Sequence, residues 1–334
     1  MLLPTLNLKI SVIICAYTEE RWEELLAAVE SVQEQTLPPY EVVVVIDHNS
    51  SLYGRACRTL KNVTVIENQE ARGLSGARNS ALALIKGDVI AFMDEDATAS
   101  PDWLEILKIG YQDQTVLGVG GQIKPDWQFK KPGWFPEEFY WVVGCTYRGL
   151  PKQAAPVRNL IGCNMSFRRE VFNSVKGFRN GIGRIGTLPV GCEETELCIR
   201  ARQLWPDRNF IYDPNAIVLH HVPSQRSTFS YFFSRCYSEG ISKALVTRFT
   251  GARSGLNSEW KHTLKVLPFG VISGFRDAIF GGDVYGLGRA STIITGLFFT
   301  TCGFLIGLLK EHWKPNNQSK SGETVISSSL VIKE

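Results

Sequence analysis

Three consecutive carboxylates, Asp94, Glu95 and Asp96, follow the apolar run at residues 90–93. If that run is a buried strand, the carboxylates lie at its end, where at least two of them can bind a divalent cation that neutralises a diphosphate. Acidic triplets also occur on solvated turns, where they bind no ligand. The triplet alone therefore leaves two interpretations open, a metal site and a surface loop.

Two other polar groups could serve the same chemistry. His220 follows an apolar segment, and carboxylates together with an imidazole can hold Mn²⁺ or Mg²⁺, so we expect Asp96 as the first metal ligand and His220 as the second. Glu193 and Glu194 begin a segment with helical spacing, where acidic residues commonly only complement the helix dipole. A like-charged neighbour also raises the pKa of a carboxyl group, so one of the pair, preferably Glu194, could deprotonate an acceptor hydroxyl. Both groups fit a displacement at a sugar carbon activated by a nucleoside diphosphate.

The elements that must position these residues alternate along the first hundred residues. Apolar runs predict strands at residues 9–15, 41–46, 63–67 and 88–93, and helical spacing predicts helices at residues 20–35 and 75–86. This alternation is typical of an α/β protein with an open, doubly wound, mostly parallel sheet, whose ligands lie beyond the carboxyl ends of the strands. Polar groups stand at three of those ends, at residues 16–17, 47–49 and 94–96. Their expected convergence on one rim favours the metal site over the surface loop.

The later chain predicts further elements. Residues 118–158 are rich in proline and aromatic residues and are expected to be a loop-rich segment that lines a cleft or covers the core. The remaining segments are expected to be a strand at 159–167, a helix at 169–175, a helix at 193–203, strands at 209–212 and 216–219 that end at His220 and His221, and an amphipathic helix at 229–246.

Composition and the C-terminal part bear on location. With 36 basic and 33 acidic residues, the chain shows no sign of a nucleic-acid track, and its eight scattered cysteines are typical of reduced thiols in the cytosol. Residues 290–309 carry no charge and are long enough to cross a membrane, although a buried helix of a soluble domain is the alternative. Residues 264–280 suit an interfacial or re-entrant helix. We expect a catalytic domain at residues 1–245, a membrane-associated helical region at 246–313 and a polar, flexible tail at 314–334.

The order and spacing of several segments resemble family 2 glycosyltransferases with a GT-A fold. The resemblance covers residue 11 to about residue 244, and its markers are SVIICAYTEE, VVVIDHNS, GLSGARNSALALIKGDVIAFMDEDA, IGCNMSFRRE and GCEETELCIRAR followed by a histidine pair. It implies inverting transfer of a sugar from a nucleotide donor, expected to be a UDP-sugar. The segment after His221 and the two apolar stretches are similar to those of transferases that act on lipid-linked acceptors, including glucuronosyltransferases of polyprenyl-phosphate sugars.

The resemblance also implies roles for individual residues. Those expected around the nucleotide are Ala16, Tyr17 and Glu19 beside the nucleoside, Asp47 on the base, Arg78 near the nucleotide and Asp94 near the ribose. Asp96 would bind the metal, and Glu194 would be the base, although this chain has Cys192-Glu193-Glu194 where the commoner pattern is Gly-Glu-Asp. Gly162, Asn164 and their neighbours would shape the acceptor pocket.

Two other functions remain open. A nucleotidyltransferase also uses a doubly wound sheet and paired carboxylates, but it would usually need a glycine-rich loop and an early basic residue, where this chain has Cys-Ala-Tyr-Thr-Glu-Glu at residues 15–20. A non-catalytic, membrane-bound module that binds nucleotide sugars would keep the same fold. The leading interpretation is a metal-dependent inverting glycosyltransferase at the cytoplasmic membrane. Its catalytic domain would face the cytosol, and its partners would be a nucleotide sugar, a lipid-linked or glycan acceptor and the membrane.

Overall fold

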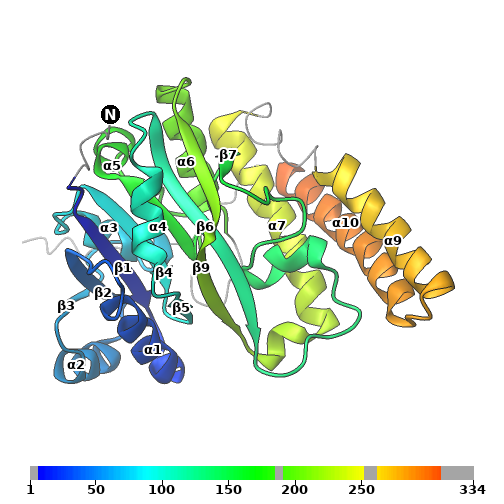
Figure 1. Ribbon diagram of the computed structural model, residues 1–334, viewed down its shortest axis with the longest axis horizontal. Helices are drawn as coiled ribbons and strands as arrows, with labels where there is room; N and C mark the ends of the chain where they lie inside the picture. Colours follow the sequence, from blue (N-terminus) through cyan, green and yellow to red (C-terminus); the bar gives the residue numbers. More distant parts are fainter. Residues whose placement is uncertain (1–6, 185–190, 252–261, 310–334) are drawn as a thin grey trace, which may run out of the picture.

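A computed structural model describes residues 7–184, 191–251 and 262–309 of the chain. Within these residues, nine strands form one mixed sheet in the order β3-β2-β1-β4-β8-β6-β9-β5, with β7 beside β9 (Figure 1). Strands β1 to β4 are parallel to one another, whereas β8 runs antiparallel to both of its neighbours. The predicted α/β fold class is therefore confirmed.

The parallel half follows the predicted alternation of strands and helices. Its strands are β1 (Ile10–Ala16), β2 (Glu41–Ile46), β3 (Thr64–Glu67) and β4 (Val89–Asp94), and its helices are α1 (Trp22–Gln33), α2 (Ser50–Thr59) and α3 (Leu74–Leu82). All of β1 is buried, as expected of a strand that helices cover on both faces. Helix α2 was not predicted from the sequence. Its buried residues are Leu52 and Ala56 alone, which are too few to show a helical period of apolar residues.

The chain after β4 adds five strands and three helices to this layer. The strands are β5 (Ala97–Ala99), β6 (Val116–Trp127), β7 (Ala155–Val157), β8 (Asn164–Arg168) and β9 (Asn209–Val222), and the helices are α4 (Trp103–Gly110), α5 (Arg169–Val175) and α6 (Glu193–Leu204). Helices α1, α2 and α4 pack their apolar side chains on one face of the sheet, and α3, α5 and α6 on the other. Because β1 pairs in parallel with β2 and β4, the carboxyl ends of these three strands meet at one edge.

The prediction of a loop-rich segment at residues 118–158 is partly wrong, because β6 occupies its first ten residues. A Cβ atom at Gly118 would lie 2.5 Å from the carbonyl oxygen of Ser166, and one at Gly121 would lie 1.9 Å from that of Ala216. Glycine is therefore required where the neighbouring strands approach β6 closely. The glycines that resemble a loop in the sequence serve sheet packing instead.

Two other strand predictions need correction. The strands expected at residues 209–212 and 216–219 form one continuous strand, β9, and His220 and His221 lie within it rather than beyond its end. The polar histidines continue the strand because β9 pairs with β5 there, with Ala97 opposite His220. The strand expected at residues 159–167 begins only at Asn164.

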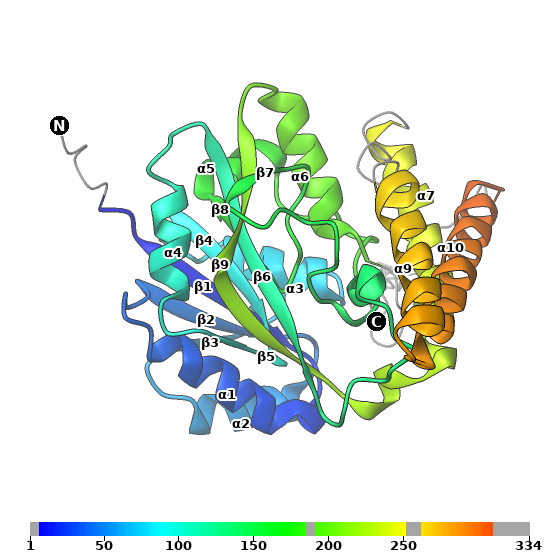
Figure 2. The same ribbon diagram turned by 45° about the vertical axis from the view of Figure 1, so that its right-hand side comes forward.

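Three long helices complete the described chain on one side of the sheet. They are α7 (Phe229–Thr250), α9 (Leu267–Phe280), preceded by the short π-helical turn η4 (His262–Val266), and α10 (Tyr285–Leu309). Figure 2 shows them side by side. A Cβ atom at Gly303 would lie 1.9 Å from the carbonyl oxygen of Tyr237, and one at Gly240 would lie 2.1 Å from that of Thr300. These glycines let the backbones of α7 and α10 approach closely.

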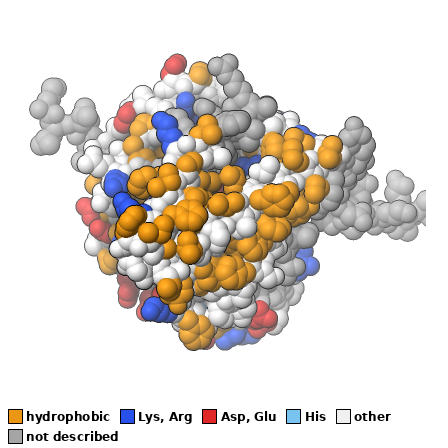
Figure 3. Space-filling view, turned by 90° about the vertical axis from the view of Figure 1, so that its right-hand side faces the viewer, with side chains coloured by type: hydrophobic (Ala, Val, Ile, Leu, Met, Phe, Trp, Pro, Cys, Tyr) orange, Lys and Arg blue, Asp and Glu red, His pale blue; other side chains and the backbone are white. Residues whose placement is uncertain are grey.

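The outer face of α9 and α10 is apolar. Large hydrophobic side chains on it include Phe269, Ile272, Ile279 and Phe280 of α9 and Ile294, Phe298, Leu305 and Leu309 of α10, all exposed. Figure 3 shows hydrophobic side chains gathered across this side of the molecule. Among the described helices, α10 is the one long and apolar enough to cross a membrane, and only 28% of its most apolar stretch is buried, which argues against a buried core helix.

Other expectations concern the cysteines and the C-terminal region. All eight cysteines are free, as predicted. The boundary expected between residues 245 and 246 lies inside α7. The tail predicted at residues 314–334 lies outside the described residues.

Candidate active site

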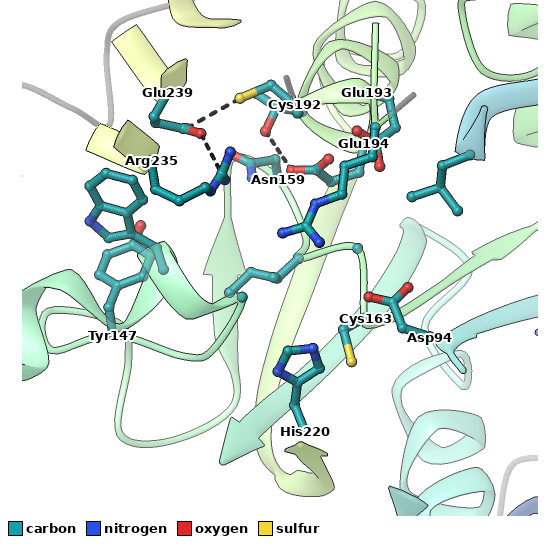
Figure 4. A pocket seen from close by; sticks show the side chains of 18 of the residues that line it. Asp94, Tyr147, Asn159, Cys163, Cys192, Glu193, Glu194, His220, Arg235 and Glu239 are labelled. Atoms are coloured by element: carbon teal, nitrogen blue, oxygen red, sulfur yellow. Dashed lines mark hydrogen bonds and ion pairs between the residues drawn. The ribbon is translucent and has the colours of Figure 1, made fainter. Parts of the chain in front are cut away.

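A cavity of about 750 Å³ lies at the edge of the sheet where β1, β2 and β4 end. Ala16, Tyr17, Asp47, Asp94 and Asp96 all line it, so the polar groups expected on one rim do converge. Its other walls come from the loop before β8, from the start of α6 and from α7, η4 and α10. Figure 4 shows acidic side chains reaching into this space from several elements.

Asp96 is buried among positively charged groups. Its Oδ2 lies 3.0 Å from Arg21 Nη1 and 3.4 Å from Arg226 Nη2, and its Oδ1 lies 3.2 Å from His220 Nε2. Burial alone would raise the pKa of Asp96, but the interactions with His220, Arg21 and Arg226 lower it well below its usual range. Asp96 is thus held as an anion, the form in which a carboxylate binds a metal. The two expected metal ligands are in contact.

His220 has a fixed orientation in the cavity wall. The residue is 3% exposed, and its Nδ1 lies 3.8 Å from the sulfur of Cys145. A Cβ atom at Gly144 would lie 3.3 Å from the ring, so the backbone of that turn packs directly against the imidazole. The other ring nitrogen, Nε2, faces the carboxylate of Asp96. His221 does not line the cavity and lies 3.8 Å from Asp126.

Arg21 ties together three residues of the rim. Its Nη1 donates a hydrogen bond of 2.6 Å to Glu95 Oε1 besides contacting Asp96, and its guanidinium lies 5.6 Å from the ring centre of Tyr17. Burial and the neighbouring charge of Asp96 outweigh Arg21 and raise the pKa of Glu95 to about 7. Glu95 therefore has a structural role, because it holds Arg21 at the cavity wall.

Asp47 is held rigidly at the end of β2. Its Oδ2 accepts a hydrogen bond of 2.9 Å from the backbone N–H of Gly73, and its Oδ1 accepts one of 2.6 Å from Asn68 Nδ2. Tyr17 lies at the mouth of the cavity and is 38% exposed. Glu19 does not line the cavity, and its nearest cation is Arg55 at 3.9 Å. The structure thus brings Asp47 and Tyr17 together with the rim but leaves Glu19 apart from it.

Arg78 connects the rim to the start of α6. It is 2% exposed, and its Nη1 lies 2.7 Å from Glu193 Oε1, while its Nη2 lies 3.6 Å from Asp94 Oδ1 and 3.3 Å from the carbonyl oxygen of Gly162. Glu193 is therefore neutralised by a buried guanidinium. This pairing leaves Glu194 as the better candidate for a base.

Glu194 lines the cavity one residue into α6. Burial and the charge of Glu193 raise its pKa to about 8, while Thr195 Oγ1 donates a hydrogen bond of 3.0 Å to its Oε1. The residue before the helix, Cys192, has a φ of 73°. Glycine adopts such a left-handed conformation most easily, which fits the glycine of the commoner family pattern at this place. The cysteine keeps that backbone turn and adds a thiol.

The two expected acceptor residues have different positions. Gly162 lines the cavity. Asn164 is fully buried and lies outside the cavity lining, because its side chain accepts a hydrogen bond from Trp103 Nε1 at 2.8 Å and donates to the carbonyl oxygens of Gln122 and Ala216 at 3.1 and 2.8 Å. Asn164 therefore braces the sheet behind the cavity wall.

A charged face of α7 forms a wall that sequence reasoning did not assign to the site. Arg235, Glu239 and Lys243 all line the cavity, with Glu239 within 3.8 Å of Arg235 and 3.4 Å of Lys243. Glu239 also accepts a hydrogen bond of 3.2 Å from the thiol of Cys192. Their spacing of four residues along a predicted helix was the available signal, since it places the charges on one face.

These features define the class of protein. A doubly wound sheet carries two aspartates and a histidine at one end of a large cavity, and a carboxylate with a raised pKa lies on another wall. This is the organisation of a glycosyltransferase with a GT-A fold. A sequence model described as glycosyl transferase family 2 matches residues 11–176. The chain belongs to glycosyl transferase family 2.

Individual relatives support this assignment. The chain is 40% identical over 243 residues to a glucosyl-dolichyl phosphate glucuronosyltransferase of Haloferax volcanii, an alignment that covers 72% of this chain and 77% of the relative. It is 34% identical over 89 residues to a UDP-Glc:alpha-D-GlcNAc-diphosphoundecaprenol beta-1,3-glucosyltransferase of Escherichia coli, covering 26% of this chain and 35% of that protein. A mannosyltransferase of Pyrobaculum calidifontis, solved with GDP-Man and Mn²⁺, has the same fold, with a TM-score of 0.56 at 19% identity over 89% of this chain and 88% of its own.

Proposed function

We propose that the protein transfers a sugar, with inversion, from a nucleoside-diphosphate donor to a hydroxyl group of a glycosylated polyprenyl phosphate. One observation carries the proposal, namely that a single cavity joins the carboxylates at the strand ends, Glu194 and the apolar C-terminal helices. A donor diphosphate at the rim and a lipid-linked acceptor arriving from the helices would meet beside Glu194. We take the proposed acceptor from the name of the Haloferax relative, which contains a glucosyl-dolichyl phosphate.

The proposed chemistry needs one proton transfer. Glu194 removes the proton of the acceptor hydroxyl as that oxygen attacks the anomeric carbon, and the bond from this carbon to the diphosphate breaks on the opposite face. The configuration of the sugar is thereby inverted. A pKa of about 8 suits this role, because a carboxylate with a raised pKa is a stronger base than an ordinary one.

Asp96 and His220 would hold a divalent cation such as Mn²⁺ or Mg²⁺. The donor set fits such an ion, since a carboxylate and an imidazole from distant parts of the chain lie 3.2 Å apart and Asp96 is kept ionised. The cation would neutralise the negative charge that builds up on the departing diphosphate. Asp47 and Tyr17 would contact the nucleoside, and Asp94 would lie near the ribose. Arg78 would lie near the nucleotide, and Gly162 would border the acceptor.

The proposed location is the cytoplasmic membrane, with the cavity facing the cytosol. The exposed apolar face of α9 and α10 supports contact with lipid, and α10 itself contributes Leu297 and Thr300 to the cavity. Free cysteines are consistent with a reducing compartment. We propose a UDP-sugar as the donor.

The experiment is a transfer assay with purified full-length protein in detergent. Labelled UDP- and GDP-sugars would be offered singly, with Mn²⁺ and a glucosyl polyprenyl phosphate as acceptor. Transfer from one UDP-sugar should be lost in E194Q and retained in E170Q, which changes an exposed glutamate on α5. Transfer from a GDP-sugar would correct the donor class, whereas nucleotide binding without turnover on any acceptor would favour a non-catalytic binding module. Undiminished transfer by E194Q would remove that residue from the mechanism.

A further inference from the structure

A thiol lies beside the carboxylate and the imidazole at the rim of the cavity. Among the described residues, Asp94, Cys163 and His220 are the group whose ligand atoms, one oxygen, one sulfur and one nitrogen, all lie within 4.8 Å of one another. They come from the end of β4, the loop before β8 and the last residues of β9. Figure 4 shows the sulfur of Cys163 between Asp94 and His220.

We propose that Asp94, Cys163 and His220 form a site for a thiophilic divalent cation of the zinc class. The donor set supports this choice, because thiolate and imidazole ligands favour Zn²⁺, whereas Mg²⁺ and Mn²⁺ favour oxygen ligands. Three protein ligands leave a fourth position, and all three residues line the cavity, so a water molecule or a phosphate oxygen can fill it.

The surroundings determine which carboxylate takes part. Asp96 is not part of this group, and its Oδ2 already contacts Arg21 and Arg226, at 3.0 and 3.4 Å. Asp94 has a more distant guanidinium, Arg78 at 3.6 Å. A thiophilic cation would therefore bind Asp94 and recruit Cys163, sharing only His220 with the ligand set proposed for Mn²⁺.

The distances require a small contraction. Zinc bonds of about 2.0–2.3 Å in a tetrahedral site separate the ligand atoms by about 3.3–3.8 Å. The longest separation between ligand atoms is at most 4.8 Å, so it has to shrink by no more than about 1–1.5 Å. Cys163 lies in the segment before β8 rather than in the sheet ladder, so a rotation of its side chain can supply the movement. Binding replaces the thiol proton, which passes to solvent, by the metal.

The site would compete with the proposed hard-cation site for His220. Zn²⁺ bound there should displace Mn²⁺ from this ligand and suppress sugar transfer. The spectroscopic test below does not need turnover, so its failure would leave the proposed transferase function untouched, and a failure of that function would leave this test valid.

Cobalt(II) is a suitable probe because it replaces zinc and reports sulfur ligands. Reduced full-length protein titrated with Co²⁺ should develop a thiolate-to-metal charge-transfer band that added Zn²⁺ abolishes. The band should be lost in C163S and retained in C145S. Cys145 is the matched control, since its sulfur also lies near His220, at 3.8 Å, but on the Nδ1 side of the ring.

Three results would overturn the proposal. They are the absence of a charge-transfer band in the unaltered protein, its persistence in C163S, and its loss in C145S instead. X-ray absorption of the zinc-loaded, unaltered protein gives a second measurement should C163S fold poorly. A single sulfur neighbour at about 2.3 Å is expected, and a shell of oxygen and nitrogen alone would refute the site.

Discussion

The pH dependence of kcat/KM tests the role of Glu194 most directly. Burial and the charge of Glu193 raise the pKa of Glu194 to about 8. A base must be unprotonated to accept a proton, so kcat/KM should fall as the pH drops below this value. With a pKa of about 8, half of the enzyme is unprotonated at pH ~8 and about one hundredth at pH ~6, so the expected fall is about fiftyfold.

The variant E193Q should move this acidic limb. It removes the like charge next to Glu194 and releases Arg78, which lies 2.7 Å from Glu193 in the unaltered protein. Both changes stabilise the ionised form of Glu194, so its pKa should decrease by about one unit or more. The ratio of kcat/KM at pH ~6 to that at pH ~8 should therefore rise. E170Q, at an exposed position, should keep the original profile.

The assay is the initial rate of labelled sugar transfer at low donor concentration, measured from about pH 5.5 to 9 at constant ionic strength and saturating metal. Ratios within one variant cancel differences in the amount of active protein. A flat profile in the unaltered protein would show that Glu194 is not the titrating base. A midpoint unchanged in E193Q would contradict the electrostatic cause assigned to the raised pKa.

The remaining predictions concern stability, metal and membrane. R78M should lower the free energy of unfolding by about 3–5 kcal/mol, because it leaves the buried carboxylate of Glu193 uncompensated. R78M/E193Q should recover part of this loss, and strictly additive losses in chemical denaturation would contradict the pairing. D96N should reduce metal-dependent transfer about a hundredfold, measured by titrating chelator-treated protein with Mn²⁺, and an unchanged metal requirement would exclude Asp96 as a ligand. F280K on the outer face of α9 should lower binding to lipid vesicles about tenfold or more in flotation assays, whereas L84K, at an exposed apolar residue beside α3, should not.

The sequence predicts those site residues that directly follow a buried strand. An apolar run that ends in Asp94-Glu95-Asp96 indicates both the strand and the polar edge, and β2 with Asp47 repeats the pattern. Because parallel strands end at one edge, their convergence follows from fold class alone. Helical spacing likewise places Glu194 near the start of α6.

The part that could not be predicted depends on contacts between distant segments. Nothing local to Arg21 or Arg226 shows that both will contact Asp96, because these residues come from separate elements. Asn164 and Cys163 are adjacent, but only the hydrogen bonds from Asn164 to the neighbouring strands show that the asparagine faces the sheet, while the cysteine before β8 lines the cavity. The role of the glycines of β6 is likewise defined by the strands beside them.

The glycine contacts between α7 and α10 limit how the chain can be dissected. Helix α7 supplies Arg235 and Glu239 to the cavity, and α10 supplies Leu297 and Thr300. Deleting the apolar helix to obtain a water-soluble fragment would thus remove a wall of the site and leave the closely packed face of α7 without its partner. Solubilisation by detergent or lipid nanodiscs keeps both helices in place. Truncation at residue 245 would remove α9 and α10 and would therefore alter the pocket.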